Sequence, residues 1–348
     1  MADPAVSEPL HGPSVSVICS WYNRPDYIAD TLDGLLSQSL SSYEVIVIND
    51  GSPDPRVREI LDSYDDQRLT VVHQENTGLT VALARAVEMA RAPYIAVQDA
   101  GDVSLPQRLE KQLALLESNP DLVAVGVWFE NALVKEDHSR VPISTHAPES
   151  SRFSQADAVR NNPLSHGEVM FRRGAYDKAG GYRALFARSQ DRDLWLRMTD
   201  FGEIGMVPET LYDRRIFGEE GIATSMAARS QQAAFAAFAV QCLEDRKQFG
   251  SDLLEEFGPH AGLFRKPSGK LAKQLAMFGI ILALQDELPR ARIYTALAIR
   301  EKKRLWPVLS WLFVGFMGAS AVPEKLRSAM AKRLARLPAI KKRMQRFK

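Results

Sequence analysis

Two aspartates follow directly after a short apolar segment in the first third of the chain. Residues 94–98 are rich in strand-forming side chains, and Asp99 and Asp102 come next, before Leu105-Pro106 opens a helical pattern. In open α/β sheets, ligands bind beside the carboxyl ends of the strands. Carboxylates there are typical ligands of Mg²⁺ or Mn²⁺, which often carry substrate phosphates. The alternative is a turn whose aspartates only cap the next helix.

Polar side chains also follow the earlier strand-like segments. The first is followed by Ser20, Tyr22 and Arg24, and the second ends in Asp50. A carboxylate can accept the ring N–H of uracil or of another base, an aromatic ring can stack on that base, and an arginine can bind base or phosphate. Each residue also has a structural interpretation, as a helix cap or a surface cation. A shared location would favour nucleotide binding.

The elements that must position these residues alternate between the hydrophobic periodicity of strands and that of helices. Such alternation predicts a mostly parallel α/β sheet flanked by helices, and right-handed crossovers would place the strand ends along one edge. After residue 122 we expect a strand at 122–129, a loop or hairpin at 135–149, a strand at 168–171 and helices at 153–161 and 191–201. The regular strand patterns lie at 15–20, 43–50, 69–73 and 94–99, and the helical patterns at 25–38, 57–64, 79–91 and 106–118.

The composition excludes several classes of protein. With 44 Lys and Arg against 43 Asp and Glu, the net charge of +1 predicts no nucleic-acid partner. Cys19 and Cys242 form neither a disulfide framework nor a metal cluster, so we expect a reducing, cytoplasmic location. Residues 1–12 lack the apolar core of a signal peptide and are predicted to be a disordered lead-in. No Gly-x-Gly-x-x-Gly or P-loop motif follows the first strand, which argues against dinucleotide-binding and NTPase folds.

Several segments, in their order and spacing, make the chain similar to family 2 glycosyltransferases. The resemblance implies a GT-A fold over residues 13–225 and an inverting transfer of a sugar from a nucleoside diphosphate donor, with UDP favoured. The segments are Val15-Ser16-Val17-Ile18 to Tyr22-Asn23-Arg24, Val45-Ile46-Val47-Ile48-Asn49-Asp50-Gly51-Ser52, Glu75-Asn76-Thr77-Gly78-Leu79, Tyr94-Ile95-Ala96-Val97-Gln98-Asp99-Ala100-Gly101-Asp102, Ser165-His166-Gly167-Glu168-Val169-Met170-Phe171-Arg172-Arg173, Gly180-Gly181-Tyr182-Arg183 and Ser189-Gln190-Asp191-Arg192-Asp193-Leu194-Trp195-Leu196-Arg197.

The same resemblance implies roles for individual residues. Asp191, in the pair Gln190-Asp191, would be the general base that takes the proton of an acceptor hydroxyl. The alternative for Asp191 is a helix N-terminal residue favoured by the dipole. His166 is a secondary candidate for contact with acceptor or phosphate. The nucleotide-sugar would be bound by Ser20, Tyr22, Arg24, Asp50, Asn76, Arg85 and Asp99.

The chain departs from the family's pattern at two places. Gly101 stands where the second acid of the Asp-x-Asp motif, usually a metal ligand, is expected, and residues 212–218 lack a histidine often found there. We expect a Mn²⁺ or Mg²⁺ site that uses Asp99 and Asp102. Alternatively, Arg214 and Arg215 neutralise the leaving diphosphate, or the enzyme is impaired.

The last third of the chain is predicted to be helical, from residue 226 to 348. Within it, residues 305–322 form an uncharged apolar segment, and residues 324–348 form a basic tail. Such a tail fits an anionic membrane surface, and the apolar segment lies at the lower limit of length for a membrane span. The alternative is an apolar helix buried against the catalytic domain beside a solvated tail.

Together these features predict a cytoplasmic glycosyltransferase, and the basic tail would allow it to be peripheral on the inner face of the plasma membrane. The acceptor would be a glycan or a lipid-linked glycan. Two alternatives are a catalytically impaired scaffold that binds glycan or nucleotide, and a sugar-nucleotide pyrophosphorylase. The second would need a Gly-rich basic loop after the first strand, where the chain has Trp21-Tyr22-Asn23-Arg24-Pro25.

Overall fold

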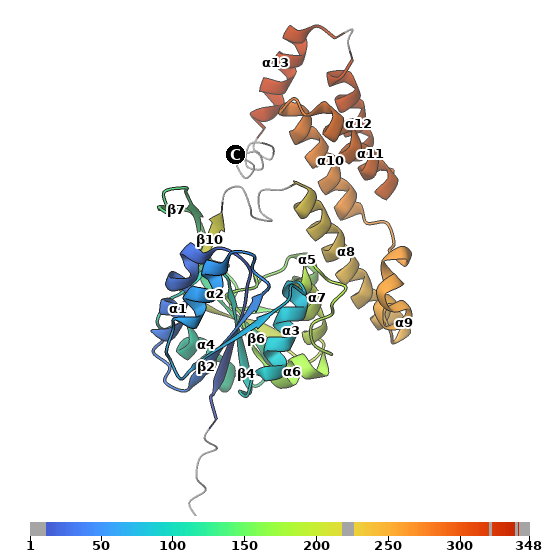
Figure 1. Cartoon of the computed structure of the whole chain (residues 1–348). Coiled ribbons are helices and arrows are strands. Elements are labelled where there is room, and N and C mark those ends of the chain that lie inside the picture. The colour runs from blue at the N-terminus through green and yellow to red at the C-terminus, as the bar shows by residue number, and fades with distance from the viewer. Residues whose placement is uncertain (1–11, 218–225, 320–321, 338–339, 341–348) are drawn as a thin grey trace, which may run out of the picture. The chain divides into compact units, whose positions relative to one another are not determined.

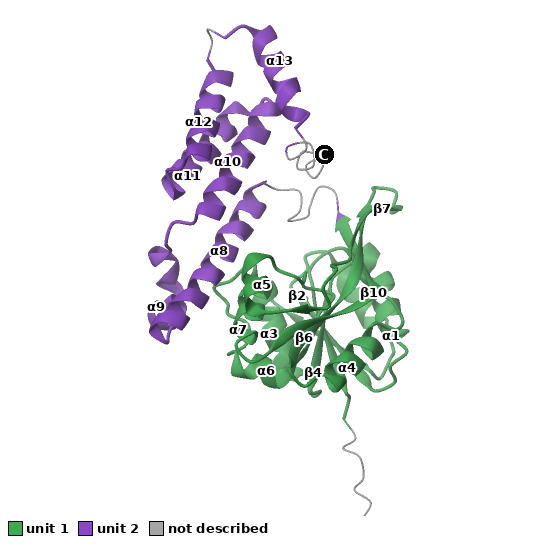
Figure 2. Ribbon diagram, turned by 180° about the vertical axis from the view of Figure 1, so that it is seen from behind, with its two compact units in different colours: residues 1–216 green, residues 217–348 purple. Residues whose placement is uncertain are grey.

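The computed structural model describes residues 12–217, 226–319, 322–337 and 340, and it divides into two compact units (Figures 1 and 2). Unit 1 comprises residues 1–216 and unit 2 residues 217–348. The predicted lead-in at 1–12 lies, except for its last residue, outside the described residues. The domain boundary predicted near residue 225 lies outside them too.

A mixed sheet forms the centre of unit 1. In its described residues the strand order is β3-β2-β1-β4-β9-β6-β10-β5, with β7 paired to β6 and β8 to β10. The first four strands in the chain are mutually parallel, whereas β9 runs antiparallel to both β4 and β6. The strands are β1 (Val15–Trp21), β2 (Tyr43–Asp50), β3 (Leu69–Gln74), β4 (Tyr94–Asp99), β5 (Val103–Ser104), β6 (Leu122–Val134), β7 (Arg140–His146), β8 (Arg152–Phe153), β9 (Met170–Arg172) and β10 (Glu203–Phe217).

Helices cover both faces of the parallel half, which is why every residue of β1 and β2 is buried. One face packs in a single apolar cluster with α1 (Ile28–Leu36), α2 (Pro55–Asp62) and α4 (Arg108–Ser118). α3 (Leu79–Met89) lies outside that cluster and also packs on β1 and β2. The expected α/β fold with flanking helices is confirmed. The other helices of unit 1 are η1 (Pro25–Tyr27), α5 (Gln155–Arg160), α6 (Arg173–Lys178) and α7 (Gln190–Met198).

The register of the parallel strands brings their carboxyl ends level. Ser20 pairs with Asp99 across β1 and β4, and Asp50 pairs with Gln74 across β2 and β3. Polar residues separated by many positions in the sequence therefore share one edge of the sheet. This is the edge at which α/β folds bind their ligands.

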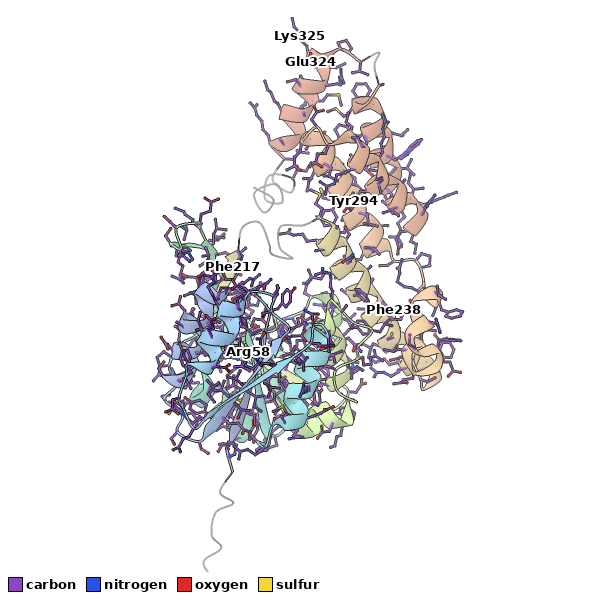
Figure 3. The ribbon with its side chains drawn as sticks, viewed as in Figure 1. Arg58, Phe217, Phe238, Tyr294, Glu324 and Lys325 are labelled. Atoms are coloured by element: carbon purple, nitrogen blue, oxygen red, sulfur yellow. The ribbon has the colours of Figure 1, made fainter. Side chains whose placement is uncertain are left out.

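Unit 2 consists of helices in its described residues, as the sequence predicted. Phe238 on α8 and Tyr294 on α11 are buried, whereas Glu324 and Lys325 begin α13 and are exposed (Figure 3). Throughout the described residues, every helix is too short or too polar to cross a lipid bilayer. The helices are α8 (Met226–Phe249), α9 (Leu253–Phe257), η2 (Gly258–Phe264), α10 (Gly269–Leu284), α11 (Leu288–Glu301), α12 (Leu305–Met317) and α13 (Glu324–Ala335).

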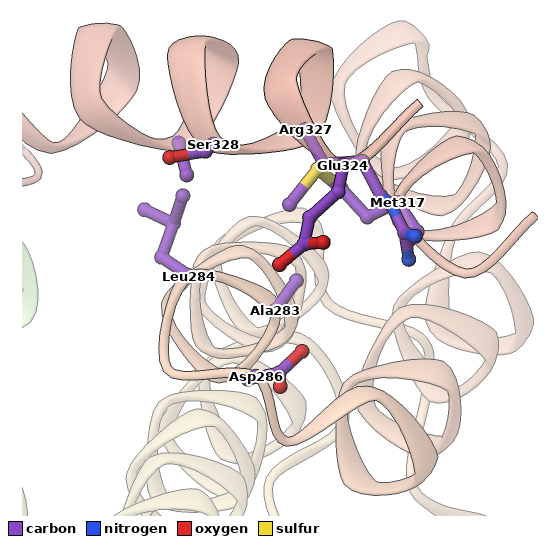
Figure 4. Close-up of a pocket in the computed structure, with 8 residues that line it drawn as sticks. Ala283, Leu284, Asp286, Met317, Glu324, Arg327 and Ser328 are labelled. Carbon is purple, nitrogen blue, oxygen red and sulfur yellow. The ribbon is translucent and has the colours of Figure 1, made fainter. Parts of the chain in front are cut away.

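A pocket of about 280 Å³ lies in unit 2 where the ends of α10 and α12 meet α13 (Figure 4). Its wall carries both charges, because Asp286 and Glu324 line it together with Arg327. None of the candidate residues named from the sequence lines this pocket, so it is separate from the site described next.

Candidate active site

The loop after β1 holds two consecutive residues in an unusual backbone conformation. Asn23 and Arg24 both have φ of 58°, in the left-handed region that residues other than glycine seldom adopt. The backbone N–H of Asn23 donates to Ser52 Oγ at 2.9 Å, which fixes this loop to the one after β2. Tyr22, between them and the strand, is 48% exposed. The ring that the sequence predicted to stack on a base is thus accessible.

Asp50, the predicted partner of the base, also organises the loop after β3. Its Oδ1 accepts hydrogen bonds from Gln74 Nε2, Thr77 N and Thr77 Oγ1 at 2.7–3.0 Å. Among the described residues its Oδ2 accepts from Gly78 N alone, at 2.9 Å, so that oxygen retains a lone pair for a further donor. Arg85 belongs to the same network, because its Nη1 donates to Gln74 Oε1 at 2.6 Å.

Asn76 approaches the loop after β2 very closely. A Cβ atom on Gly51 would lie 2.5 Å from Asn76 N, and Gly51 has φ of 69°. Glycine is therefore required at position 51 for the two loops to meet. Asn76 itself is exposed, while Ser20 at the end of β1 is buried. Most of the residues predicted to bind the nucleotide thus lie at the ends of β1, β2 and β3 or in the loops after them, while Arg85 lies on α3 and Asp99 ends β4.

Asp99 pairs with His166 at the end of β4. His166 Nδ1 lies 2.7 Å from Asp99 Oδ1, and His166 Nε2 lies 3.2 Å from the hydroxyl of Tyr182. Burial alone would raise the pKa of Asp99, but the charge and hydrogen bond of His166 hold it below its usual value. The Asp99 side chain is 36% exposed and its Oδ2 has no hydrogen-bond partner among the described residues. One oxygen is thus oriented by His166 and the other is open.

Gly167 permits this contact. A Cβ atom at position 167 would lie 2.1 Å from Tyr212 Oη and 2.9 Å from Asp99 N. Both atoms belong to the interior, so neither can move aside without disturbing β4 or β10. The loop that carries His166 reaches Asp99 only because residue 167 lacks a side chain.

Asp102 has a different environment from Asp99. It is 4% exposed, its Oδ1 accepts from the backbone N–H of Arg215 at 2.7 Å, and its Oδ2 accepts from Tyr212 Oη at 2.9 Å. Burial and the negative charge of Asp99 raise the pKa of Asp102. Each Asp102 oxygen accepts one hydrogen bond and the side chain is almost inaccessible, which disfavours the cation binding that the sequence predicted.

A divalent ion fits a site at Asp99 alone better than a site made by Asp99 and Asp102 together. The described residues contain no group of three or more His, Cys, Asp or Glu side chains placed to hold a metal ion. Mg²⁺ and related ions are nevertheless often bound by one carboxylate together with substrate phosphates and water. The open Oδ2 of Asp99 meets that requirement, whereas Asp102 anchors β10 to the end of β4.

Arg214 and Arg215 have different contacts. Arg215 Nη1 lies 2.5 Å from Asp30 Oδ2, so this side chain is engaged in an ion pair. Arg214 packs against the ring of Phe129, with its guanidinium carbon 5.9 Å from the ring centre, and has no ion pair among the described residues. Its charge lowers the pKa values of Asp99, Asp102 and Glu168 against the effect of their burial. Of the two, Arg214 is therefore the cation available to an anionic ligand.

Asp191 lies in the first turn of α7, after Ser189, which has φ of 57°. Asn162 Nδ2 donates to Asp191 Oδ2 at 3.1 Å. Burial raises the pKa of Asp191, and the charge of His166 opposes this rise. His166 thus interacts with both Asp99 and Asp191. Gln190 beside it is buried. A backbone outlier and a carboxyl of raised pKa at one helix start are typical of a functional position.

Sequence reasoning missed three residues of this network: Asn162, Tyr182 and Tyr212. Tyr182 belongs to the quoted segment Gly180-Gly181-Tyr182-Arg183, and Tyr212 lies two positions before Arg214. Their positions in motifs were visible, but nothing in the sequence connects their side chains to Asp102, Asp191 or His166. Asn162 carried no signal beyond its adjacency to Pro163.

Comparisons with known proteins agree with this fold. The model of "Glycosyl transferase family 2" matches residues 16–180. The putative glycosyltransferase EpsE of Bacillus subtilis is 34% identical over 212 residues, which are 59% of this chain and 73% of that protein. The putative teichuronic acid biosynthesis glycosyltransferase TuaG of the same organism is 34% identical over 194 residues, 55% of this chain and 73% of that protein.

Solved structures share the fold at low sequence identity. The mannosyltransferase PcManGT from Pyrobaculum calidifontis, in complex with GDP-Man and Mn²⁺, has a TM-score of 0.55 at 17% identity over 98% of this chain and 85% of that chain. S. aureus TarS 1–349, in complex with UDP, has a TM-score of 0.51 at 14% identity over 86% of this chain and 90% of that chain. The fold is therefore the GT-A fold of sugar transferases. The chain belongs to glycosyltransferase family 2.

Proposed function

We propose that this transferase moves a sugar from a nucleoside diphosphate donor, with UDP favoured, to a hydroxyl of a glycan or a lipid-linked glycan. The observation that carries the proposal is His166, which is hydrogen-bonded to Asp99 and interacts with the half-buried Asp191. Asp99, where the donor phosphates would bind, and Asp191, the candidate base, therefore belong to one network. The printed names of similar proteins support it: TarS is described with UDP and UDP-GlcNAc, and AmsE of Erwinia amylovora as an amylovoran biosynthesis glycosyltransferase.

The reaction would be a single displacement with inversion. Asp191 takes the proton of the acceptor hydroxyl, and the oxygen attacks the anomeric carbon. The bond from that carbon to the diphosphate oxygen breaks, and the diphosphate leaves with the electron pair. Asn162 holds the Asp191 carboxylate in position.

The leaving diphosphate requires positive charge. Arg214 supplies a fixed cation beside Asp99, and Tyr22 and Asp50 orient the base of the nucleotide. A Mn²⁺ or Mg²⁺ ion at Asp99 Oδ2, when bound, would supply a Lewis acid for the diphosphate oxygens. Asp102 and Arg215 hold β10 in place so that Arg214 keeps its position.

Release of nucleoside diphosphate tests the proposal. The full chain is incubated with a panel of UDP- and GDP-sugars, with and without glycan acceptors, and the released diphosphate and the anomeric configuration of the product are measured. We expect release from one donor class, an inverted product, and a loss of about 10²–10⁴-fold in kcat for Asp191→Asn with UDP binding retained. Asp177→Asn, on the exposed surface of α6, is the control.

Three outcomes would contradict parts of the proposal. Turnover that survives in Asp191→Asn would exclude this residue as the base. A product with retained configuration would exclude a single displacement. Nucleotide binding without turnover on any donor would favour the impaired scaffold.

A further inference from the structure

The outward face of α12 is apolar, whereas a helix on a protein surface usually has polar residues on its outward face. The residues that face the rest of unit 2 are Pro307, Ser310, Val314 and Met317, spaced three or four positions apart. The outward residues are larger and more apolar, and the helix has no charged side chain. Leu305 is 75% exposed, Leu312 53% and Trp311 49%, and Leu309, Trp306 and Val308 are also exposed.

Packing within unit 2 does not explain this outward face. The apolar cluster of unit 2 includes Val314 of α12 and, at its margin, Phe313, but none of the six outward residues. The buried Ser310 bonds locally, since its hydroxyl donates to Pro307 O at 2.7 Å. Contiguous exposed apolar surface on a folded protein commonly marks a site of interaction.

Basic residues next to this face indicate what it contacts. Lys302, Lys303 and Arg304 immediately precede α12, are exposed, and make no ion pair within the described part of the chain. Tryptophan side chains such as Trp306 and Trp311 favour the boundary between lipid and water. An apolar helix face preceded by unpaired cations is typical of binding to an anionic bilayer.

The length of α12 decides how it would bind. Its 13 residues extend about 20 Å, whereas the hydrocarbon core of a bilayer is about 30 Å thick. The helix cannot span that distance, but it can lie in the plane of the interface with one face in the lipid. Its inner face would stay on α10 and α11.

We propose that the outward face of α12 docks onto an anionic lipid surface, with residues 302–304 contacting the headgroups. The sequence analysis predicted membrane contact through the basic tail, whereas this proposal places the contact on α12, before that tail. The docking goes beyond sugar transfer. The docking itself does not depend on the proposed function. The idea that docking brings the enzyme to a lipid-linked acceptor does rest on it.

Flotation of the full chain with vesicles tests this surface. The vesicles contain phosphatidylcholine alone or mixed with phosphatidylglycerol, and three multiple variants are compared with the wild type. The first is Trp306→Ser, Leu309→Ser and Trp311→Ser; the second is Lys302→Gln, Lys303→Gln and Arg304→Gln. The matched control is Phe249→Ser and Leu263→Ser, which removes exposed apolar side chains from another part of unit 2.

We expect the wild type and the control to float with the mixed vesicles. The α12 variant should bind at least about tenfold more weakly, and the basic variant should lose the preference for phosphatidylglycerol. Brominated lipid in the mixed vesicles should quench the tryptophan fluorescence of the wild type and of the control. Circular dichroism checks that every variant is folded.

Several outcomes would overturn the proposal. They are equal flotation of the α12 variant and the wild type, equal binding to both kinds of vesicle, or a dimer in solution that the α12 variant converts to a monomer. The last would assign the face to a second copy of the chain. Nucleotide release from a soluble donor should be unchanged in the α12 variant, so failure of transfer and failure of docking are separable.

Discussion

His166 Nδ1 lies 2.7 Å from Asp99 Oδ1, so an imidazole from the segment before β9 orients the carboxylate at the end of β4. Removing that hydrogen bond would let the Asp99 side chain rotate. We expect His166→Ala to lower kcat/KM for donor hydrolysis about 10–100-fold, the usual effect of losing a residue that orients a ligand. His166→Gln should recover part of this loss.

The control for this variant is Tyr182→Phe, which removes only the contact at His166 Nε2. It should reduce kcat/KM less than His166→Ala does. A larger effect of Tyr182→Phe would mean that the tyrosine, not Asp99, is the important partner of His166.

Asp191 should set the acidic limb of the pH profile. A base acts only when ionised, so kcat/KM rises with pH through the pKa of Asp191, which burial raises above its usual value of 3.8. The Asn162 amide donates to the carboxylate and favours its charged form. We therefore expect Asn162→Ala to shift the acidic limb to higher pH, while Asn161→Ala, its exposed neighbour, leaves the limb in place. An acidic limb that is unchanged in Asn162→Ala would contradict the assignment.

Removal of divalent ions distinguishes the two aspartates of the β4 loop. EDTA should abolish donor hydrolysis and Mn²⁺ or Mg²⁺ should restore it. Asp99→Asn should require a higher ion concentration, because Asp99 has the open oxygen. Asp102→Asn should instead lower the free energy of unfolding by about 1–3 kcal/mol, since it disturbs buried hydrogen bonds. Unchanged activity in EDTA would show that the side-chain cations alone neutralise the diphosphate.

Arg214 should recognise the diphosphate rather than the nucleoside. Loss of a charged hydrogen-bond donor costs about 1.5–3 kcal/mol, so Arg214→Gln should weaken UDP binding about 10–100-fold. Uridine should bind the variant and the wild type alike, as measured by calorimetry. Arg56→Gln, at an exposed ion pair, is the control. Equal losses for uridine and UDP would indicate a general disturbance of the pocket.

Glu168 should make the protein less stable as the pH rises. Its Oε2 is buried with no hydrogen-bond partner in the part of the chain that the structure describes, and burial raises its pKa from 4.5 to about 7. Between these values the folded state binds more protons than the unfolded state, so the free energy of unfolding falls with increasing pH. Complete ionisation costs about 3 kcal/mol. In urea titrations across this range, Glu168→Gln should remove that part of the pH dependence, and an unaltered slope would assign it to other groups.

The sequence by itself determined the positions of the strand ends. Apolar runs bounded by turn residues are local signals, since strands such as β1 and β2 are buried on both faces and are therefore mostly apolar. Asp50 and Asp99 could therefore be assigned to one sheet edge, and Asp191 to the start of a helix, before any contact was known. The motif resemblance rests on the same local segments.

Only the tertiary structure decided which side chains meet. His166 and Asp99 are 67 positions apart, and Tyr212 and Asp102 are 110 apart. Such contacts depend on how whole elements pack, and hydrophobic periodicity carries no information about them. Asp99 and Asp102 look equivalent in the sequence, yet one remains open and the other is closed by β10. Likewise, residues 305–317 read as uniformly apolar, and only packing on α10 and α11 determines which side of α12 faces outward.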